Sequence, residues 1–238
     1  MVDIHSHILP MVDDGAKSWE IAVEMVKMAE ADGITHMVAT PHANYEFDYN
    51  RESHAARLAE LQAKVGSGIE LILGCDFHLS CDNVDDAMKN TGRYTIGTTR
   101  YLVIELSDLL VPSQIPNQLL QLTSRGLTPI LTHPERNPVL QGKPDHVREW
   151  AEMGMLVQLT ANAFSGKWGK GVQKLANAFA EKGLVHVLAS DAHGTNHRRP
   201  VLSEARKAVA RSFGDAFATA FVETNPMAII HNQPLRGM

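Results

Sequence analysis

Seven short runs of apolar residues recur along the chain at intervals of about 30 residues, which is the usual length of a strand–helix–strand unit. Their length and their content of β-branched and other apolar residues are typical of strands buried in a parallel sheet. The predicted strands are Val2–Ser6, His36–Thr40, Glu70–Asp76, Tyr101–Glu105, Thr128–Thr132, Met155–Thr160 and Val185–Ser190.

Apolar residues at helical spacing lie between most of these strands. Ala22, Met25, Val26 and Ala29 form one stripe, and Ser18 is placed to cap the amino end of that helix. A second stripe comprises Leu175, Ala176, Phe179 and Ala180. No linker-like segment or repeat array interrupts the alternation. The pattern therefore predicts one α/β domain over residues 1–238, built on a parallel sheet.

The candidate chemistry lies where the predicted strands end. In parallel α/β proteins the reactive groups collect at the carboxyl ends of the strands, and six of the seven runs lead into residues that bind metal ions. The side chains in question are His5, His7, Asp14, His42, Asp76, Glu105, His133, Asp191 and His193. Only a closed ring of strands could direct so many ends to one point, so the pattern favours a barrel over an open sheet.

Each of these residues also has an ordinary structural explanation. His42 follows Pro41 and could close a turn, Glu105 could be half of a buried ion pair, and Asp191 could cap a helix together with His193. A His-x-His pair alone is a weak signal for metal. The specific signal is the recurrence of such residues at one end of successive strands, whereas the seven other histidines lack that placement. Those histidines are His36, His54, His78, His146, His186, His197 and His231.

Composition narrows the class of protein. Apolar residues make up 44% of the chain and charged residues 21%, which excludes a disordered or fibrous protein. A net charge of −5 gives no reason to expect binding to nucleic acid or to an anionic membrane. The two cysteines fit a reducing compartment, and no apolar run reaches the roughly 18 residues of a membrane helix. We therefore expect a cytoplasmic protein without membrane insertion, and the oligomeric state is left open.

Several of these segments together resemble the polymerase-and-histidinol-phosphatase (PHP) superfamily. They are Asp3-Ile4-His5-Ser6-His7, Asp13-Asp14-Gly15-Ala16, Ala39-Thr40-Pro41-His42, His133-Pro134-Glu135-Arg136-Asn137 and Ala189-Ser190-Asp191-Ala192-His193. The chain is most similar to the branch of bacterial tyrosine-protein phosphatases of the CpsB/CapC/YwqE type, which serve capsular and exopolysaccharide biosynthesis. The resemblance runs from residue 2 to about residue 230. It implies a distorted (βα)7 TIM-like barrel, the PHP fold.

The resemblance also implies a site with three divalent metal ions. Manganese is the expected metal, and iron and zinc are the alternatives. One ion would be held by His5, His7, Asp76 and Asp191, and a second by Asp76, Glu105 and His133. A third would be held by Asp14, His42 and His193. Asp76 departs from the family, which usually has the longer Glu at this bridging position. With four carboxylates and three divalent ions the site would be positive and would attract a phosphate monoester.

Two arginines are candidates to bind the phosphoryl group. Arg136 follows a predicted strand end, and a guanidinium matches phosphate oxygens in a bidentate manner. By the resemblance, Arg198 corresponds to a family arginine with the same role. Because Arg199 is adjacent, the sequence leaves open which of the two contacts phosphate. The activity implied is hydrolysis of phosphotyrosine by a metal-activated hydroxide. The implied substrate is a tyrosine-phosphorylated protein, in particular the tail of a bacterial tyrosine kinase that regulates polysaccharide synthesis.

The sequence excludes two other kinds of enzyme and leaves three alternatives open. A cysteine-based phosphatase needs an arginine six residues after its cysteine, but Cys81 follows Cys75 at that spacing and Ala87 follows Cys81. A Gly-rich nucleotide-binding loop is also absent from the sequence. The open alternatives are a PHP-type phosphatase of small metabolites such as histidinol phosphate, a metallo-amidohydrolase, and a metal-binding PHP module without catalysis. No predicted strand ends in the lysine with which many amidohydrolases bridge their metals.

Overall fold

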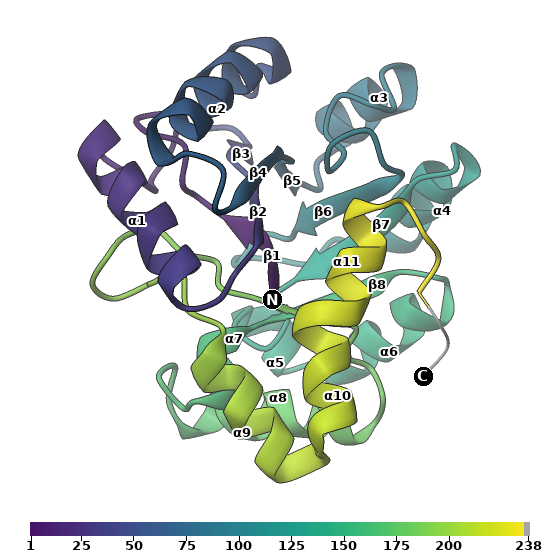
Figure 1. The fold of residues 1–238 in the computed structure, drawn as a ribbon. Coiled ribbons are helices and arrows are strands. Elements are labelled where there is room, and N and C mark those ends of the chain that lie inside the picture. Colours follow the sequence, from purple (N-terminus) through teal and green to yellow (C-terminus); the bar gives the residue numbers. More distant parts are fainter. Residues whose placement is uncertain (236–238) are drawn as a thin grey trace.

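Short parallel strands occupy the centre of the molecule and helices surround them (Figure 1). The computed structural model describes residues 1–235 of the chain. Its strands are β1 (Val2–Ser6), β2 (His36–Ala39), β3 (His42–Ala43), β4 (Glu70–Leu73), β5 (Asp76–His78), β6 (Tyr101–Glu105), β7 (Thr128–Thr132), β8 (Leu156–Thr160) and β9 (Val187–Ala189). Each of the seven predicted strand regions contains at least one of these strands, so the strand prediction is confirmed.

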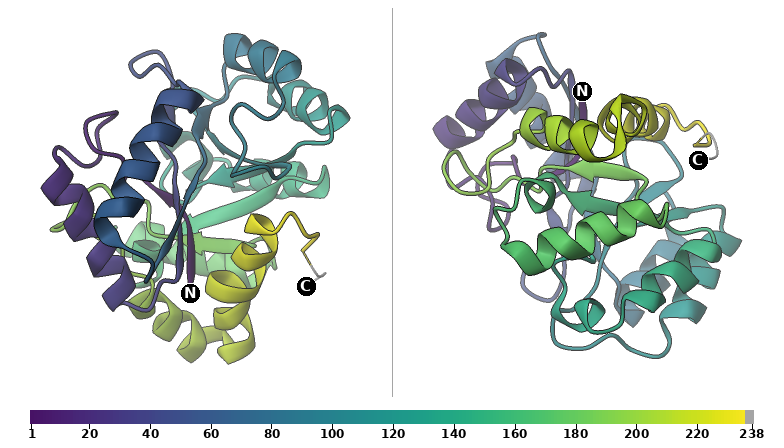
Figure 2. Two further views of the ribbon diagram at one scale, coloured as in Figure 1. Left: turned by 45° about the horizontal axis from the view of Figure 1, so that its top comes forward. Right: turned by 90° about the horizontal axis from the view of Figure 1, so that it is seen from below.

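The helices follow the strands along the chain and form the outer layer in the views of Figure 2. They are α1 (Trp19–Ala31), α2 (Arg51–Val65), α3 (Cys81–Lys89), α4 (Ile115–Ser124), α5 (Pro138–Gln141), α6 (Pro144–Glu152), α7 (Ala161–Phe164), α8 (Lys170–Glu181), α9 (Ser203–Phe213), α10 (Asp215–Thr219), the π-helix η1 (Ala220–Thr224) and α11 (Asn225–Ile230). Ser18 caps α1 as predicted, since its side chain accepts a hydrogen bond from the backbone N–H of Ile21.

All strand pairs are parallel, and the pairing within residues 1–235 divides between two sheets. One has the order β1-β2-β4 and the other the order β3-β5-β6-β7-β8-β9. A single bridge joins Ser6 of β1 to Ala192, just beyond β9. The prediction of a parallel α/β fold is therefore confirmed, whereas this pairing does not by itself trace one closed barrel.

The structure differs from the prediction at two strands, each of which is followed by a further short strand. The region His36–Thr40 continues past Pro41 as β3, and Glu70–Asp76 is interrupted at Gly74 and Cys75. The packing at Gly74 is tight, because a Cβ there would lie 2.9 Å from Cγ1 of Val38. The breaks shift the chain so that β3 and β5 begin at the candidate ligands His42 and Asp76, whose backbones are paired in register.

Apolar side chains form two separate clusters. The larger cluster joins the helices to the strands and contains the predicted stripe of α1, all four of whose residues are buried. The smaller cluster is built from residues of β1, β2, β6, β7 and β9 together with Ile229 of α11. Figure 1 shows α11 lying beside the amino end of β1. The strands are thus packed on both faces, which holds their carboxyl ends in fixed positions.

Candidate metal centre

The nine predicted ligands come from the ends of successive strands and from the loops after them. His5 lies on β1, and His7 and Asp14 follow that strand. The others lie at β3, β5 and β6 or directly after β7 and β9, and these are His42, Asp76, Glu105, His133, Asp191 and His193. Since parallel strands present their carboxyl ends at the same edge, these side chains lie close together in space.

Three groups of side chains have ligand atoms within 4.8 Å of one another. They are His7 with Asp14, His42 and His193; His5 with His7 and Asp76; and His42 with Asp76 and Glu105. Seven of the nine predicted ligands belong to these groups. The grouping differs in detail from the family pattern, because His7 also joins the third predicted set and His42 also joins the second.

The remaining two predicted ligands contact these groups. Nε2 of His133 lies 3.4 Å from a carboxylate oxygen of Glu105. Oδ1 of Asp191 lies 3.5 Å from Nε2 of His5 and 3.5 Å from Nε2 of His7. The structure therefore brings all nine predicted residues into one connected cluster.

Three of the imidazoles are held through Nδ1, so that Nε2 faces the cluster. His5 donates to Oε1 of Gln158 at 2.9 Å, and His7 donates to Oδ2 of Asp13 at 2.8 Å. Nδ1 of His193 lies 3.0 Å from the backbone oxygen of Asp191. A hydrogen bond of this kind fixes the tautomer and leaves the other nitrogen free to bind a metal ion.

Gln158 and Asp13 were not among the predicted site residues. Gln158 lies on β8, in the one of the seven predicted strand regions that supplies none of the predicted ligands, and it is fully buried. A polar residue within an otherwise apolar strand was the sequence signal that could have indicated it. Asp13 precedes the predicted ligand Asp14, and from the sequence alone either aspartate of that pair could have been the one that turns inward.

The backbone is strained at two of the predicted ligands. His133 has a φ of 33° and Asp191 a φ of 50°, a left-handed conformation that residues other than glycine adopt rarely. His133 comes directly after β7, and Asp191 lies two residues beyond the end of β9. Such strain persists where surrounding contacts enforce it, and it concentrates at functional sites.

The carboxylates and imidazoles of the cluster strongly change each other's pKa values. Burial alone would raise the pKa of Asp76, but the charge of His5 and the imidazole of His42 hold it well below its usual range. Burial would lower the pKa of His5, yet the charges of Asp191 and Asp76 raise it to about 9. In the same way Asp14 and Asp76 outweigh burial at His42 and raise its pKa to about 11. Without metal, protons on His5 and His42 therefore balance part of the negative charge.

Other members of the cluster lose their charge instead. Burial and the charge of His193 lower the pKa of His7 to about 4, while burial and Arg136 lower that of His133 to about 3. Burial and the nearby charge of Asp76 raise the pKa of Glu105 to about 8. The centre is thus a buried set of groups whose preferred charges depend on a cation between them.

Asp76 provides a direct test of whether a metal ion fits. Its side chain is 1% exposed, and neither carboxylate oxygen accepts a hydrogen bond from any residue in the described range 1–235. Three imidazole nitrogens nevertheless surround Oδ2, at 3.2 Å for His42, 3.5 Å for His5 and 3.9 Å for His7. A buried ionised carboxylate without donors is costly unless a cation compensates it. Imidazole and carboxylate donors suit manganese, iron or zinc.

Both predicted arginines lie at the edge of this cluster. Arg136 and Arg198 each donate to Oδ2 of Asp191, and Nε of Arg198 also donates to the backbone oxygen of Asp191 at 3.2 Å. Arg199 is directed elsewhere, with its guanidinium 3.5 Å from a carboxylate oxygen of Glu204. Of the two neighbouring arginines, the structure therefore brings Arg198 to the cluster.

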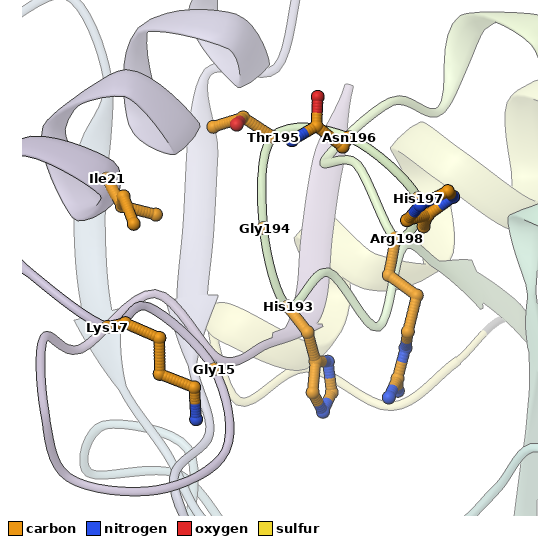
Figure 3. Close-up of a pocket in the computed structure, with 9 residues that line it drawn as sticks. All are labelled: Gly15, Lys17, Ile21, His193, Gly194, Thr195, Asn196, His197 and Arg198. Atoms are coloured by element: carbon orange, nitrogen blue, oxygen red, sulfur yellow. The ribbon is translucent and has the colours of Figure 1, made fainter.

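A hollow of about 260 Å³ opens beside the cluster, and Figure 3 shows residues that line it. In this view the side chains of Lys17, His193 and Arg198 extend in the same direction, with Lys17 and Arg198 on either side of His193. His197, one of the seven histidines outside the predicted site, lines this hollow but belongs to none of the three ligand groups.

Fold and site together define an α/β protein with a cluster of imidazoles, carboxylates and arginines at the carboxyl ends of its strands. The chain belongs to the family described as capsular polysaccharide synthesis, CpsB/CapC, which matches residues 1–231. No helix within residues 1–235 has the length and apolar character needed to cross a membrane.

Similar proteins support the assignment to this family. CapC of Staphylococcus aureus is 33% identical, over 86% of this chain and 81% of its own. The tyrosine-protein phosphatase CpsB of Streptococcus pneumoniae is 30% identical, over 98% of this chain and 99% of its own. A solved structure superposes with a TM-score of 0.92 at 27% identity, covering 100% of this chain and 97% of the other. It comes from work on YwqE of Bacillus subtilis and CpsB of S. pneumoniae, described as metal-dependent tyrosine phosphatases.

Proposed function

We propose that this chain is a metal-dependent protein-tyrosine phosphatase, a phosphoric monoester hydrolase acting on phosphotyrosine. Relatives that cover nearly the whole chain are named tyrosine-protein phosphatases. The observation that carries the proposal is that two arginines, both paired with Asp191, lie at the edge of the buried cluster around Asp76. Cations balance the carboxylates of such a cluster, and the arginines add positive charge where a phosphoryl group would enter.

In this proposal the centre holds three divalent ions, and manganese is the expected metal. His5, His7, Asp76 and Asp191 bind one ion; Asp76, Glu105 and His133 bind the second; Asp14, His42 and His193 bind the third. When bound, the ions polarise the phosphoryl oxygens and lower the pKa of water. Asp13 and Gln158 hold the imidazoles of His7 and His5 in the orientation that offers Nε2.

Arg136 and Arg198 bind the phosphoryl oxygens of the substrate. A guanidinium has five N–H donors, and Arg136 uses only one nitrogen in its contact with Asp191. Arg198 uses two nitrogens on Asp191, and one Nη remains. Both groups are thus held at the edge of the cluster with donors left for a phosphate. Their contacts would strengthen as negative charge develops on the transferring group.

A second hollow supports an aryl phosphate as substrate. It has a volume of about 250 Å³ and contains Glu105 and His133 of the cluster together with Arg136. Trp168 and Val172 give it an apolar wall. An aromatic ring packs well against such a wall, whereas the short chain of phosphoserine would leave it unfilled. The phenol of tyrosine, with a pKa of about 10, is also the better leaving group.

The fold in this proposal is the distorted (βα)7 barrel of the PHP type, as a single domain over residues 1–238. Supporting it, the bridge from Ser6 to Ala192 links the first strand to the last, and Thr40 donates to the backbone oxygen of Ser6 at 2.8 Å. Residues from five different strands also meet in one apolar cluster.

We further propose that the substrate is a tyrosine-phosphorylated protein, in particular a bacterial tyrosine kinase that regulates capsular or exopolysaccharide synthesis. The description of the family supports the link to capsular polysaccharide. Cys75 and Cys81 are both free thiols, which suits action in the cytoplasm.

The test uses purified protein stripped of metal with a chelator and then reloaded with Mn²⁺ or Mg²⁺. We expect the stripped protein to be inactive and Mn²⁺ to restore hydrolysis of a phosphotyrosine peptide at least as well as Mg²⁺, which binds imidazole poorly. Activity that survives exhaustive chelation would rule out a metal-dependent reaction. Much faster turnover of histidinol phosphate than of any phosphotyrosine peptide would replace this proposal with a metabolite phosphatase.

A further inference from the structure

A basic groove lies beside the candidate centre and includes Arg198 in its lining. It has a volume of about 520 Å³ and is lined by Asn162, Lys167 and Trp168 on one side and by residues 195–199 on the other. Lys167, Arg198 and Arg199 contribute three positive charges, and no carboxylate belongs to the lining. This is notable in a chain with a net charge of −5.

Two of these cations are already bridged by a carboxylate of the protein. Glu204 lies 2.6 Å from Nζ of Lys167 and 3.5 Å from the guanidinium of Arg199. All three side chains are between 40% and 47% exposed, so the bridge lies at the surface and can exchange with other groups. The arrangement indicates that Lys167 and Arg199 can share one carboxylate.

The groove is continuous with the candidate centre. Arg198 lines it and also pairs with Asp191, and Trp168 lines both this groove and the hollow that contains Arg136. A peptide whose phosphotyrosine enters the centre would therefore place residues next to that tyrosine beside Lys167 and Arg199.

We propose that Lys167 and Arg199 recognise an acidic side chain adjacent to phosphotyrosine in the protein substrate, and that Glu204 competes for the same two cations. This specificity rests on the proposed phosphatase function. The chemistry is that of exposed ion pairs, so each contact is modest in strength and weakens with added salt.

The test compares three phosphotyrosine peptides with glutamate, alanine or lysine at the two positions on each side of the tyrosine. For the metal-loaded protein, we expect kcat/KM to follow the order glutamate, alanine, lysine, and the order to flatten at high salt. In the double variant Lys167→Gln/Arg199→Gln, the advantage of the glutamate peptide over the alanine peptide should fall about fivefold, as loss of two exposed ion pairs allows. Hydrolysis of p-nitrophenyl phosphate, which has no flanking residues, should stay unchanged.

The variant Glu204→Gln provides the opposite change. It frees both cations, so the preference for the glutamate peptide should increase. Lys27→Gln/Arg148→Gln serves as the matched control, because it removes the same charge from exposed positions outside the groove. Equal kcat/KM for the three peptides, or an equal effect of the control variant, would overturn the proposal. If neither p-nitrophenyl phosphate nor any peptide is hydrolysed, the phosphatase function itself fails.

Discussion

The guanidinium of Arg136 lies 4.2 Å from the centroid of the Trp168 indole ring, in a cation–π contact at the edge of the candidate centre. The contact restrains the flexible side chain of Arg136 in addition to its ion pair with Asp191. We expect Trp168→Leu to lower kcat/KM for phosphotyrosine peptides about threefold to thirtyfold, the range of one cation–π contact, with unchanged metal content. Trp19→Leu removes a surface tryptophan that also lies beneath cations and should have no effect. Equal losses in both variants would indicate a general effect on packing.

Removal of Arg136 itself separates phosphate binding from metal binding. Arg136→Ala should lower kcat about a hundredfold, because a donor that acts on developing negative charge is lost. Its partner Asp191 keeps the contact with Arg198, so the metal content should remain that of the unmodified protein. Steady-state kinetics and elemental analysis of the same preparation measure the two effects. If the metal is lost as well, Arg136 has a structural role and the assignment is wrong.

Asp76 is the carboxylate on which the centre depends most. Both of its oxygens lack hydrogen-bond donors within residues 1–235, and without metal the nearby imidazoles of His5 and His42 compensate its buried charge. Metal ions bound by these imidazoles would take over that compensation. Asp76→Asn keeps the size of the side chain and removes the charge, and it should lose at least one ion per chain together with nearly all turnover. Asp76→Glu restores the residue that the family usually has and should retain metal. Asp86→Asn, which changes an aspartate paired with Arg93 away from the centre, serves as the control.

Gln158 should act on metal binding through His5 without contacting an ion. Its Oε1 holds Nδ1 of His5 at 2.9 Å, and partners of this kind typically contribute 10- to 100-fold to metal affinity. We expect Gln158→Leu to weaken Mn²⁺ binding by about that factor, and Gln158→Glu, which keeps an acceptor, to recover much of it. The measurement is a competition titration against a fluorescent chelator. Gln118→Leu changes another buried glutamine, on α4, and should leave the affinity unchanged.

The part of this site that the sequence could predict depends on a local pattern, in which an apolar run is followed by a residue that can bind metal. A ligand that ends a strand, such as Glu105 or His7, is marked by the apolar run before it, and all nine predicted ligands do meet in the structure. The short strand β3 after Pro41 and the interruption at Gly74 were not predicted, because they depend on how neighbouring strands approach each other, as the 2.9 Å distance from a Cβ at Gly74 to Val38 indicates.

Contacts between residues far apart in the sequence could not be predicted from the pattern of apolar and polar positions. Gln158 meets His5 across 153 positions, and no periodicity connects the two. The same holds for Trp168, whose place beneath Arg136 depends on the path of the loop after α7. The sequence also could not show whether Arg198 or Arg199 points to the cluster. Tertiary contacts set the side-chain directions of two adjacent loop residues, and the sequence does not show those contacts.

The binding of metal should depend on pH, because three of the proposed ligands hold protons at neutral pH when no metal is bound. Neighbouring carboxylates overcome burial and raise the pKa of His5 to about 9 and that of His42 to about 11, so both are protonated at neutral pH. His7 and His133, with pKa values of about 4 and about 3, are already neutral there. Glu105, with a pKa of about 8, also holds a proton at neutral pH. A metal ion must displace the protons from His5, His42 and Glu105, and each displaced proton changes the apparent Kd about tenfold per pH unit below its pKa.

We therefore expect the affinity for Mn²⁺ to rise as the pH is raised from 6 to 9, with the steepest change below the pKa of His5. Calorimetric titration in buffers with different ionisation enthalpies should show the release of roughly three protons at neutral pH. His146→Gln removes an exposed histidine on α6, outside the cluster, and should reproduce the pH profile of the unmodified protein. A Kd for Mn²⁺ that stays constant over this range would mean that His5 and His42 do not exchange their protons for metal.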